Sequence, residues 1–369
     1  MAKTSTMPHN VLLALEWYDY RFHRGVARVA AREGWHLTSP SGRPGFQPVP
    51  EDWRGTGAIT LAGDVWLNRL RQRNVAVVDI GLTGSRQVPR TVVDNAAVAA
   101  LAYAFLRERG WQSFIALGGW GKSRMLIERV DAFARLATAE GLACDQIQIE
   151  DLRPRLGHGR VAIFAAQDVL GAQAQAVARD LGLRVPEDIA ILGVDNNDLV
   201  CEALPVPLAS VDTDQEGLGV AAAERLARLL AGHHDEGALV RHPPRGVVAR
   251  TSAEAFGTDH PGLQAALALA RQNPACGVRA LALAAGLSPQ GLDLAFHRDL
   301  GLAPGTFLRR QRLRVAEDAL AAGASLEDAA ARAGLATASG LCALMRRERG
   351  VTPAQWRTRE QRGRPPTSR

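Results

Sequence analysis

The chain has 369 residues, two to three times the size of a common domain, and 47% of them are hydrophobic. Its formal charge of +6 is unevenly placed: residues 259–369 hold 16 basic and 9 acidic side chains, whereas residues 1–258 hold 28 and 29. No apolar run reaches the roughly 18 to 20 residues of a membrane span. The four cysteines lack the spacing of metal ligands or redox pairs. Residues 1–10 lack the apolar core of a secretory signal, so we expect a cytoplasmic protein with no membrane partner.

Short apolar runs alternate with helical periodicity over residues 10–255. Such alternation is typical of parallel sheets covered by helices on both faces. About 250 residues are too many for one open sheet. We therefore expect an α/β domain of two lobes over residues 1–256. In chain order, the predicted strands and helices are 11–15, 21–33, 57–61, 65–73, 75–80, 95–109, 113–117, 127–140, 160–164, 169–181 and 189–194.

A break follows at residues 253–262, where Gly, Pro and Asp replace the periodic pattern. Only helical periodicity continues beyond it, and the excess positive charge begins at the same point. We therefore expect an all-α domain over residues 259–369 that binds a polyanion. Its predicted helices are 261–273, 278–285, 289–300, 305–322, 326–333, 338–349 and 353–359.

One unit occurs twice in this domain, at about residues 276–301 and 324–350. Each copy is a short helix, a glycine turn at Gly286 or Gly334, and a second helix that ends at a glycine. This order is the helix-turn-helix plan. The linking helix of about 18 residues would span roughly 27 Å at 1.5 Å per residue. Because successive major grooves lie roughly 34 Å apart, the two second helices can reach adjacent grooves of double-stranded DNA.

Three stretches of this domain carry a family resemblance: FLRRQRLRVAEDAL at 307–320, SLEDAAARAGL at 325–335 and RRERGVTPAQWR at 346–357. They resemble the AraC-type DNA-binding domain. The resemblance implies a tandem helix-turn-helix transcription regulator that binds double-stranded DNA. It also implies contact with RNA polymerase if the protein is an activator.

The second helix of each unit is expected to face DNA bases. In the first unit, Gln290 suits adenine, Asp293 suits the cytosine amino group and Leu294 suits the thymine methyl group. In the second unit only Ser339 can form a hydrogen bond to a base. We therefore expect the first unit to carry most of the contacts with bases and the second unit mainly to contact phosphates. Loss of specific readout in this chain remains an alternative. The other predicted DNA-binding residues are Arg298, Arg310, Arg346 and Arg347.

The first domain carries four ordered motifs: VDN at 93–95, IERVDAF at 127–133, VPEDIAILGVDN at 185–196 and PPRGVVARTS at 243–252. They resemble the sugar sensor of the lac repressor family, which has the periplasmic-binding-protein type 1 fold. Fused ahead of an AraC-type domain, they are similar to bacterial regulators of xylose operons. This implies a small sugar effector, xylose or a similar sugar, in the cleft between the lobes, and a homodimer.

The resemblance also implies ligand-binding residues. Tyr18 and Asp19 follow the first strand, Arg129 corresponds to the arginine that binds sugar hydroxyls, and Asp195 follows a later strand. Asn95 and Asp168 begin helices beside the expected cleft. For these two, a role as a helix cap is as good an interpretation as ligand contact.

A nucleotide hydrolase is the alternative from another class of protein. Gly121, Lys122 and Ser123 follow a strand as in a P-loop, but Ala116 stands where the first glycine of that motif is required. No histidine has an acid or nucleophile partner at a diagnostic spacing, so we expect no catalytic residues and no enzyme activity. We also expect no metal and no cofactor.

Overall fold

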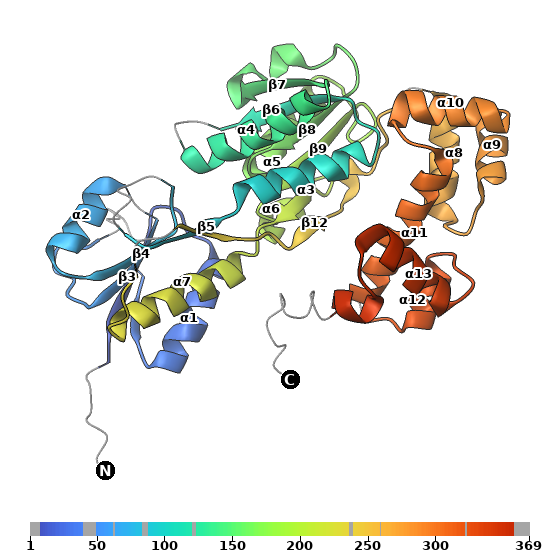
Figure 1. Cartoon of the computed structure of the whole chain (residues 1–369). Helices are drawn as coiled ribbons and strands as arrows, with labels where there is room; N and C mark the ends of the chain where they lie inside the picture. The colour runs from blue at the N-terminus through green and yellow to red at the C-terminus, as the bar shows by residue number, and fades with distance from the viewer. Residues whose placement is uncertain are drawn as a thin grey trace.

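The computed structural model describes residues 8–39, 49–61, 63–82, 88–119, 123–235, 239–258, 260–321 and 323–357. Figure 1 shows two α/β lobes followed by a separate group of helices. Each lobe is built on one six-stranded sheet. The expected fold class, a two-lobed α/β sensor fold followed by tandem helix-turn-helix units, is confirmed.

The first lobe contains a fully parallel sheet in the order β11-β5-β4-β3-β1-β2. Its central strands are buried on both faces, as parallel strands covered by helices usually are. The elements of this lobe are β1 (Asn10–Leu15), α1 (Tyr20–Glu33), β2 (His36–Thr38), β3 (Gly57–Leu61), α2 (Asp64–Gln72), β4 (Ala76–Asp79), β5 (Arg90–Val93), α7 (Gln215–Leu230) and β11 (Leu239–His242).

The second lobe has the strand order β12-β10-β9-β8-β6-β7, in which only β12 is antiparallel to its neighbour. Phe133 and Phe164 stack in its core with ring centroids 4.5 Å apart. Its elements are α3 (Asn95–Arg107), β6 (Ser113–Gly118), α4 (Arg124–Ala139), β7 (Ala143–Gln148), β8 (Val161–Ala165), α5 (Asp168–Asp180), β9 (Ile189–Val194), α6 (Asp198–Cys201), β10 (Ala209–Asp212) and β12 (Gly246–Val248).

The chain passes between the lobes three times: from β5 to α3, from β10 to α7, and from β11 to β12. Asp214 lies in the second passage with φ of 53°. Its carboxylate contacts His242, the last residue of β11, at 3.0 Å and Arg245, in the third passage, at 2.7 Å. These contacts tie two of the three connections together at the junction of the lobes.

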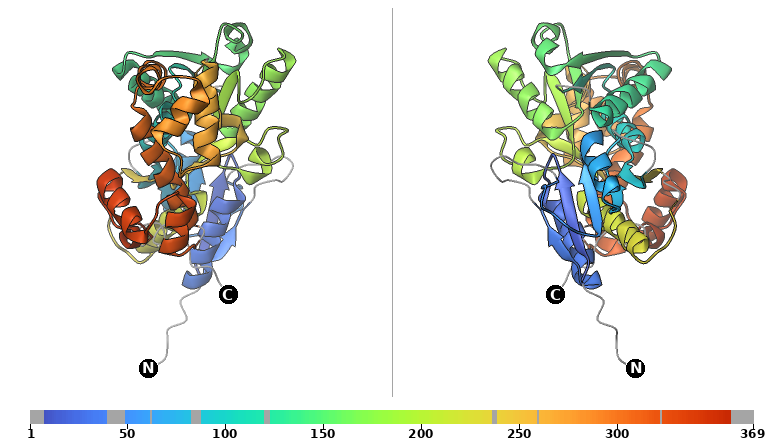
Figure 2. Two further views of the ribbon diagram at one scale, coloured as in Figure 1. Left: turned by 90° about the vertical axis from the view of Figure 1, so that its right-hand side faces the viewer. Right: turned by 90° about the vertical axis from the view of Figure 1, so that its left-hand side faces the viewer.

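The helical part begins with α8 and contains two hydrophobic cores. Phe256, Phe296 and Phe307 lie in the first core, and Leu341 and Met345 lie in the second. Figure 2 shows the first group of helices beside the second lobe and the final helices lower down. The elements are α8 (Pro261–Gln272), α9 (Val278–Ala285), α10 (Pro289–Leu300), α11 (Pro304–Ala321), α12 (Leu326–Arg332) and α13 (Ala338–Arg349). Among the described residues, no helix is long and apolar enough to cross a membrane.

The structure adds several elements that the sequence analysis did not predict: the strands β2, β5, β7, β10, β11 and β12 and the helices α6 and α7. The strands β2, β7 and β11 have exposed positions that break the apolar run of a buried strand. The strands β5 and β10 lie inside the sheets and are buried, but each is only four residues long. Helix α4 begins at Arg124, three residues before the predicted start at Ile127. The glycine turns of the helical part are as expected, with φ of 64° at Gly286 and 68° at Gly334, values that favour glycine.

Candidate functional site

Arg129 lies at the centre of a buried polar cluster where the lobes meet. Its Nε donates to Asn95 Oδ1 at 2.9 Å, one Nη donates to the carbonyl of Ala166 at 2.8 Å, and the other donates to Asp195 Oδ1 at 3.1 Å. Its side chain is almost fully buried, so the paired carboxylate and carbonyl offset the cost of removing the charge from water. The structure thus brings together three of the predicted ligand-binding residues, which come from α3, α4 and the end of β9.

The cluster continues from Asn95 toward the first lobe through Glu128. Asn95 Nδ2 donates to Glu128 Oε2 at 2.8 Å, and Arg241 in β11 donates to both oxygens of the same carboxylate. Burial raises the pKa of Glu128, but the hydrogen bonds from Arg241 and Asn95 outweigh it and lower the pKa overall. Asn95 is therefore more than a helix cap. The side chain that caps α3 is that of Asp94, which accepts from the amide of Ala97.

Arg21 joins the lobes and was not among the predicted residues. Its guanidinium pairs with Asp19 at 2.7 Å within the first lobe. It also donates to the backbone carbonyls of Asp195 and Asn196 in the second lobe, at 2.9 and 2.5 Å. Sequence reasoning missed it because its partners are carbonyl groups 174 and 175 residues away.

Asp19 and Tyr18 lie on the first lobe, as expected, but they differ in role. Asp19 is buried, and its carboxylate accepts from the amides of Arg21 and Phe22 as the N-cap of α1. Tyr18 is 48% exposed, and its hydroxyl lies 3.0 Å from His23 Nδ1. Asp19 thus fixes the start of α1 and the position of Arg21, and Tyr18 is half exposed beside His23.

Asp168 is buried below the loop that follows β9. It accepts from Ser210 Oγ at 2.5 Å and from the amide of Asn197 at 2.7 Å. Burial and the nearby Asp195 carboxylate raise the pKa of Asp168 to about 7. Asp195 and Asn196 have positive φ, and Ser210 also accepts from the amide of Asn196. Asp168 therefore holds the strained loop that presents Asp195, and its side chain does not cap α5.

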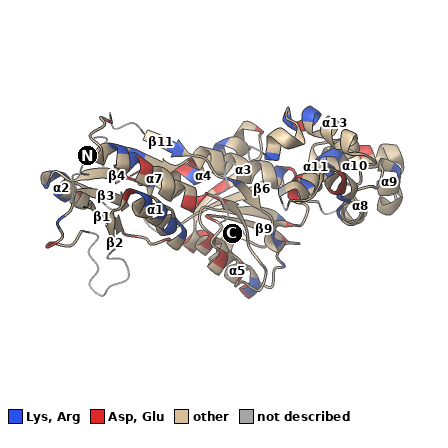
Figure 3. Ribbon diagram, turned by 90° about the horizontal axis from the view of Figure 1, so that it is seen from below, with Lys and Arg blue, Asp and Glu red and all other residues tan. Residues whose placement is uncertain are grey.

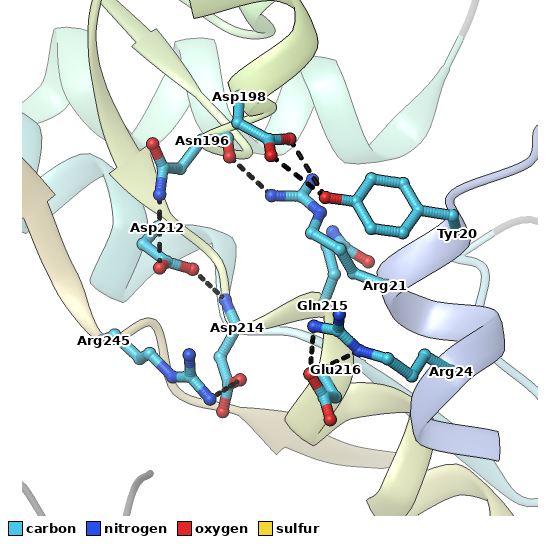
Figure 4. Close-up of a pocket in the computed structure, with 10 residues that line it drawn as sticks. All are labelled: Tyr20, Arg21, Arg24, Asn196, Asp198, Asp212, Asp214, Gln215, Glu216 and Arg245. Carbon is cyan, nitrogen blue, oxygen red and sulfur yellow. Dashed lines mark hydrogen bonds and ion pairs between the residues drawn. The ribbon is translucent and has the colours of Figure 1, made fainter. Parts of the chain in front are cut away.

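A cavity of about 160 Å³ lies beside this cluster, at the junction of the lobes (Figure 4). Its lining is polar and comes from the start of α1, the ends of β9 and β10, the start of α7 and the third passage. It shares none of the six predicted ligand-binding residues. Arg21 borders both the cavity and the Arg129 cluster through its contacts with Asp195 and Asn196. The lining residues are Tyr20, Arg21, Arg24, Asn196, Asp198, Asp212, Asp214, Gln215, Glu216 and Arg245.

Several charged groups around the cavity are already engaged by a neighbouring side chain. Tyr20 donates to the carboxylate of Asp198, and Arg24 contacts Glu216 at 2.5 Å. Arg245 contacts Asp214, as described above. An ionic ligand would have to break such pairs, whereas hydroxyl groups can add hydrogen bonds to them.

The residues proposed for a P-loop are only partly described. Gly121 and Lys122 lie outside the described residues, and Ser123 is the N-cap of α4 without a side-chain capping bond. The carboxylate of Asp195, which would have to hold magnesium in that interpretation, is occupied by Arg129 and Thr213. Among the described residues, no group of acidic, His and Cys side chains is placed to hold a metal ion.

The second helix of the first helix-turn-helix unit, α10, exposes one continuous face. Gln290, Asp293 and Leu294 all lie on it, and Leu294 is 72% exposed. His297 is a fourth exposed residue on this face, and its Nδ1 lies 3.3 Å from Asp293 Oδ2. Sequence reasoning omitted His297, although its position four residues after Asp293 would have revealed it. Arg298 is also exposed and pairs with Asp299.

The corresponding helix of the second unit, α13, exposes Ser339, Arg346 and Arg347. Figure 3 shows basic residues along α13. Between the serine and the arginines this surface carries only small side chains, those of Cys342 and Ala343. The predicted contrast in side-chain chemistry between the two helices is therefore present at the surface.

Helix α11 divides its arginines between internal contacts and the surface. Arg312 donates to the carbonyls of Pro274 and Cys276, and Arg309 donates to Glu348 and Thr306. These two arginines are therefore engaged within the protein. Arg310 is exposed, as its predicted role requires.

Two family models match the chain. Residues 96–253 match the periplasmic binding protein-like domain, and residues 281–359 match a helix-turn-helix domain. The chain therefore joins a periplasmic binding protein-like domain to a helix-turn-helix domain. The first match covers the second lobe, the second and third passages, and α7 and β11 of the first lobe. The second match begins within α9 and extends over both helix-turn-helix units.

Two relatives match the chain over different lengths. The xylose operon regulatory protein of Escherichia coli (strain K12) is 24% identical over 347 residues, which cover 85% of this chain and 88% of the relative. The chain is homologous to that protein. The transcriptional regulator CelR of Thermobifida fusca is 29% identical over 157 residues, covering 39% of this chain and 45% of CelR.

Solved structures agree on the fold. The structure of the xylose-binding transcription activator xylR matches with a TM-score of 0.59 and 21% identity, covering 96% of this chain and 98% of the other. A CelR–cellobiose complex matches with a TM-score of 0.56 and 22% identity, covering 66% of this chain and 84% of that one. The resemblances inferred from the sequence, to a sugar sensor and to an AraC-type domain, are confirmed.

Proposed function

We propose that this protein is a sugar-responsive transcription regulator that binds double-stranded DNA. The observation that carries this proposal is the presence in one chain of two lobes with a polar cluster between them and of two helix-turn-helix units. A relative aligned over 85% of the chain regulates a xylose operon by its name. Relatives of this arrangement are regulators, which supports a role other than that of an enzyme.

The ligand is a neutral monosaccharide, and xylose is the first candidate. Arg21, Arg129 and Arg245 at the junction of the lobes are already paired with carboxylates, which favours a polyhydroxyl ligand over an anionic one. Arg129 and Asp195 present a donor and an acceptor of the type that recognises adjacent hydroxyl groups. Tyr18 adds an exposed aromatic ring that can stack on a sugar. We assign Asn95, Asp19 and Asp168 to the support of these groups.

Ligand binding changes DNA binding through the relation of the two lobes. A ligand can shift this equilibrium only by binding one arrangement more tightly than the other. Arg21 and the Arg129 cluster contact both sides of the junction, so a sugar placed there meets groups from both lobes. We further propose that the protein acts as a homodimer on paired sites in the cytoplasm, and that it contacts RNA polymerase if it activates transcription.

A thermal-shift screen of the purified full-length protein against monosaccharides tests the sensor. A ligand at 100 times its Kd adds about 2.7 kcal/mol to the free energy of unfolding of the unit that binds it, which raises its Tm by several degrees. Xylose is expected to produce this shift. DNA binding with and without the active sugar, and the mass in solution by light scattering, then test the response and the dimer. Absence of a shift with every monosaccharide would refute the sensor.

The role of Arg129 has a matched control on the same helix. Arg129→Met is expected to abolish the Tm shift by sugar, measured against the variant's own Tm without sugar. Arg135→Met changes an exposed arginine of α4 in the same way and is expected to keep the shift. An unchanged shift in Arg129→Met would show that the ligand binds elsewhere, and the cavity in Figure 4 is then the next place to search.

A further inference from the structure

The end of α10 is held by the second lobe. The side-chain amide of Gln112 donates to two consecutive carbonyls in the last turn of this helix, those of Arg298 at 3.1 Å and Asp299 at 2.8 Å. The last four carbonyls of a helix have no partner within the helix. Gln112 therefore acts as a cap that comes from a different domain, 186 residues away in the chain.

Two further contacts hold the same helix end. The side chain of Leu300 packs so closely on Gly110 that a Cβ at Gly110 would lie 2.0 Å from it. Thr258 Oγ1, in the segment between the domains, donates to the carboxylate of Asp299 at 2.6 Å. Gly257 packs in turn against the carbonyl of Gly110. The last turn of α10 is thus fixed on three sides, whereas its first two turns expose the face that carries Gln290 and Leu294.

We call the contacts of Gln112, Gly110 and Thr258 with the last turn of α10 the mount. A single helix leads from the polar cluster to this mount. Helix α3 begins at Asn95, which is bonded to Arg129, and its last residue is Arg107. Arg107 donates to the carbonyl of Trp111 at 3.0 Å, directly before Gln112. Figure 1 shows α3 running from the junction of the lobes toward the helical part. A displacement of α3 at the cluster would therefore reach α10 without passing through a flexible connection.

We propose that Gln112 is a positioning residue that couples the sugar site to the first DNA-reading helix. By capping α10, it makes this helix move with α3 and the second lobe, so that a ligand-driven change at Asn95 alters the direction in which α10 faces DNA. The second unit joins the first group of helices through α11 and through the close packing of Gly334 on Ala275, and neither connection involves Gln112. The proposal rests on the proposed function, because it assigns a route to the response described there.

Gln112→Glu in the full-length protein tests the proposal. The variant keeps the size of the side chain but places a carboxylate against two carbonyls and near Asp299. Sugar affinity is expected to stay within twofold of the wild type. The ratio of DNA affinities with and without sugar is expected to fall at least threefold toward 1. Gln146→Glu changes an exposed glutamine of β7 in the same lobe by the same charge and is expected to leave the ratio unchanged.

Variants at Thr258 test the same proposal if Gln112→Glu does not fold. Thr258→Val removes the hydroxyl group that holds Asp299 and is expected to lower the same ratio, whereas Thr258→Ser retains a hydroxyl group and is expected to restore it. A wild-type ratio in both Gln112→Glu and Thr258→Val would overturn the proposed role of Gln112 but would leave the proposed function standing. A wild-type protein that binds sugar poorly or shows no change in DNA affinity would overturn the proposed function as well.

Discussion

The two helix-turn-helix units share a plan but differ in support and in surface. The reading helix of the first unit, α10, is mounted on the second lobe and exposes Gln290 and Asp293. The reading helix of the second unit, α13, packs on α12 and α11, where Arg349 pairs with Glu317 at 2.8 Å. It exposes small side chains and then arginines.

This difference matches the demands of two kinds of DNA contact. Base readout needs specific donors and acceptors held in a fixed direction, because hydrogen bonds to base edges are short and directional. Phosphate contact needs positive charge near the backbone and tolerates freedom of orientation. The unit that carries base-contacting side chains is the one held by the sensor domain. This suggests that the sugar controls the contacts with bases more than the contacts with phosphates.

The largest effect is expected from the core of the mounted unit. Phe296 is fully buried and packs edge to face on Phe307, which also contacts Phe256 in the segment between the domains. Phe296→Ala is expected to cost about 3–5 kcal/mol in the free energy of unfolding of this unit. Chemical denaturation followed by circular dichroism measures the loss.

The matched control removes a buried side chain from the other unit. Met345→Ala is expected to cost about 2–5 kcal/mol in the second core while the mount and the sugar response persist. If Phe296→Ala left the sugar response of DNA binding intact, the mounted unit would not be the controlled one, and the comparison would fail.

The next largest effect is expected from the phosphate contacts of α13. Arg346→Ala combined with Arg347→Ala is expected to weaken binding to every DNA sequence by about 10- to 100-fold near 0.15 M salt. The slope of log affinity against log salt is expected to shrink by about 2, one for each lost phosphate contact. Fluorescence anisotropy over a salt series measures both. A loss confined to one sequence would show that these arginines read bases.

Much of this contrast was predictable from the sequence. The glycine turns and the 3.6-residue periodicity are local signals, and they placed α9, α10 and α13 closely. The residue types of the two reading helices follow directly from the sequence once the helices are placed. The buried cluster of Arg129, Asn95 and Asp195 was reached through the family resemblance.

The contacts between distant segments were not predictable. Arg21 acts through carbonyl groups, and every residue carries one, so its sequence neighbourhood holds no signal of its partners. Gln112 caps a helix that begins 177 residues later, and nothing local marks it as a cap. Exposed edge strands such as β7 were not predicted for a related reason, because pairing through backbone groups leaves little pattern in the side chains.

A smaller and more selective effect is expected at Gln290. Gln290→Ala is expected to lower affinity for the preferred operator by about tenfold, within the roughly 1–3 kcal/mol of a base contact, with little change on unrelated DNA. Binding-site selection followed by anisotropy on the selected and a scrambled duplex measures it. An equal loss on both duplexes would make Gln290 a backbone contact and remove the basis for calling α10 the reader.

The smallest effect is expected at Ser339, the polar side chain at the start of the exposed face of α13. Ser339→Ala removes one hydroxyl group from a helix whose neighbouring surface positions are the half-buried Cys342 and the exposed Ala343, so a specific base contact would have little support there. Affinity for the selected operator is expected to change by less than about twofold, within the ±0.5 kcal/mol of an ordinary surface substitution. The same anisotropy assay detects a larger change. A tenfold loss confined to the operator would show that both units read bases, and the division of roles between them would no longer hold.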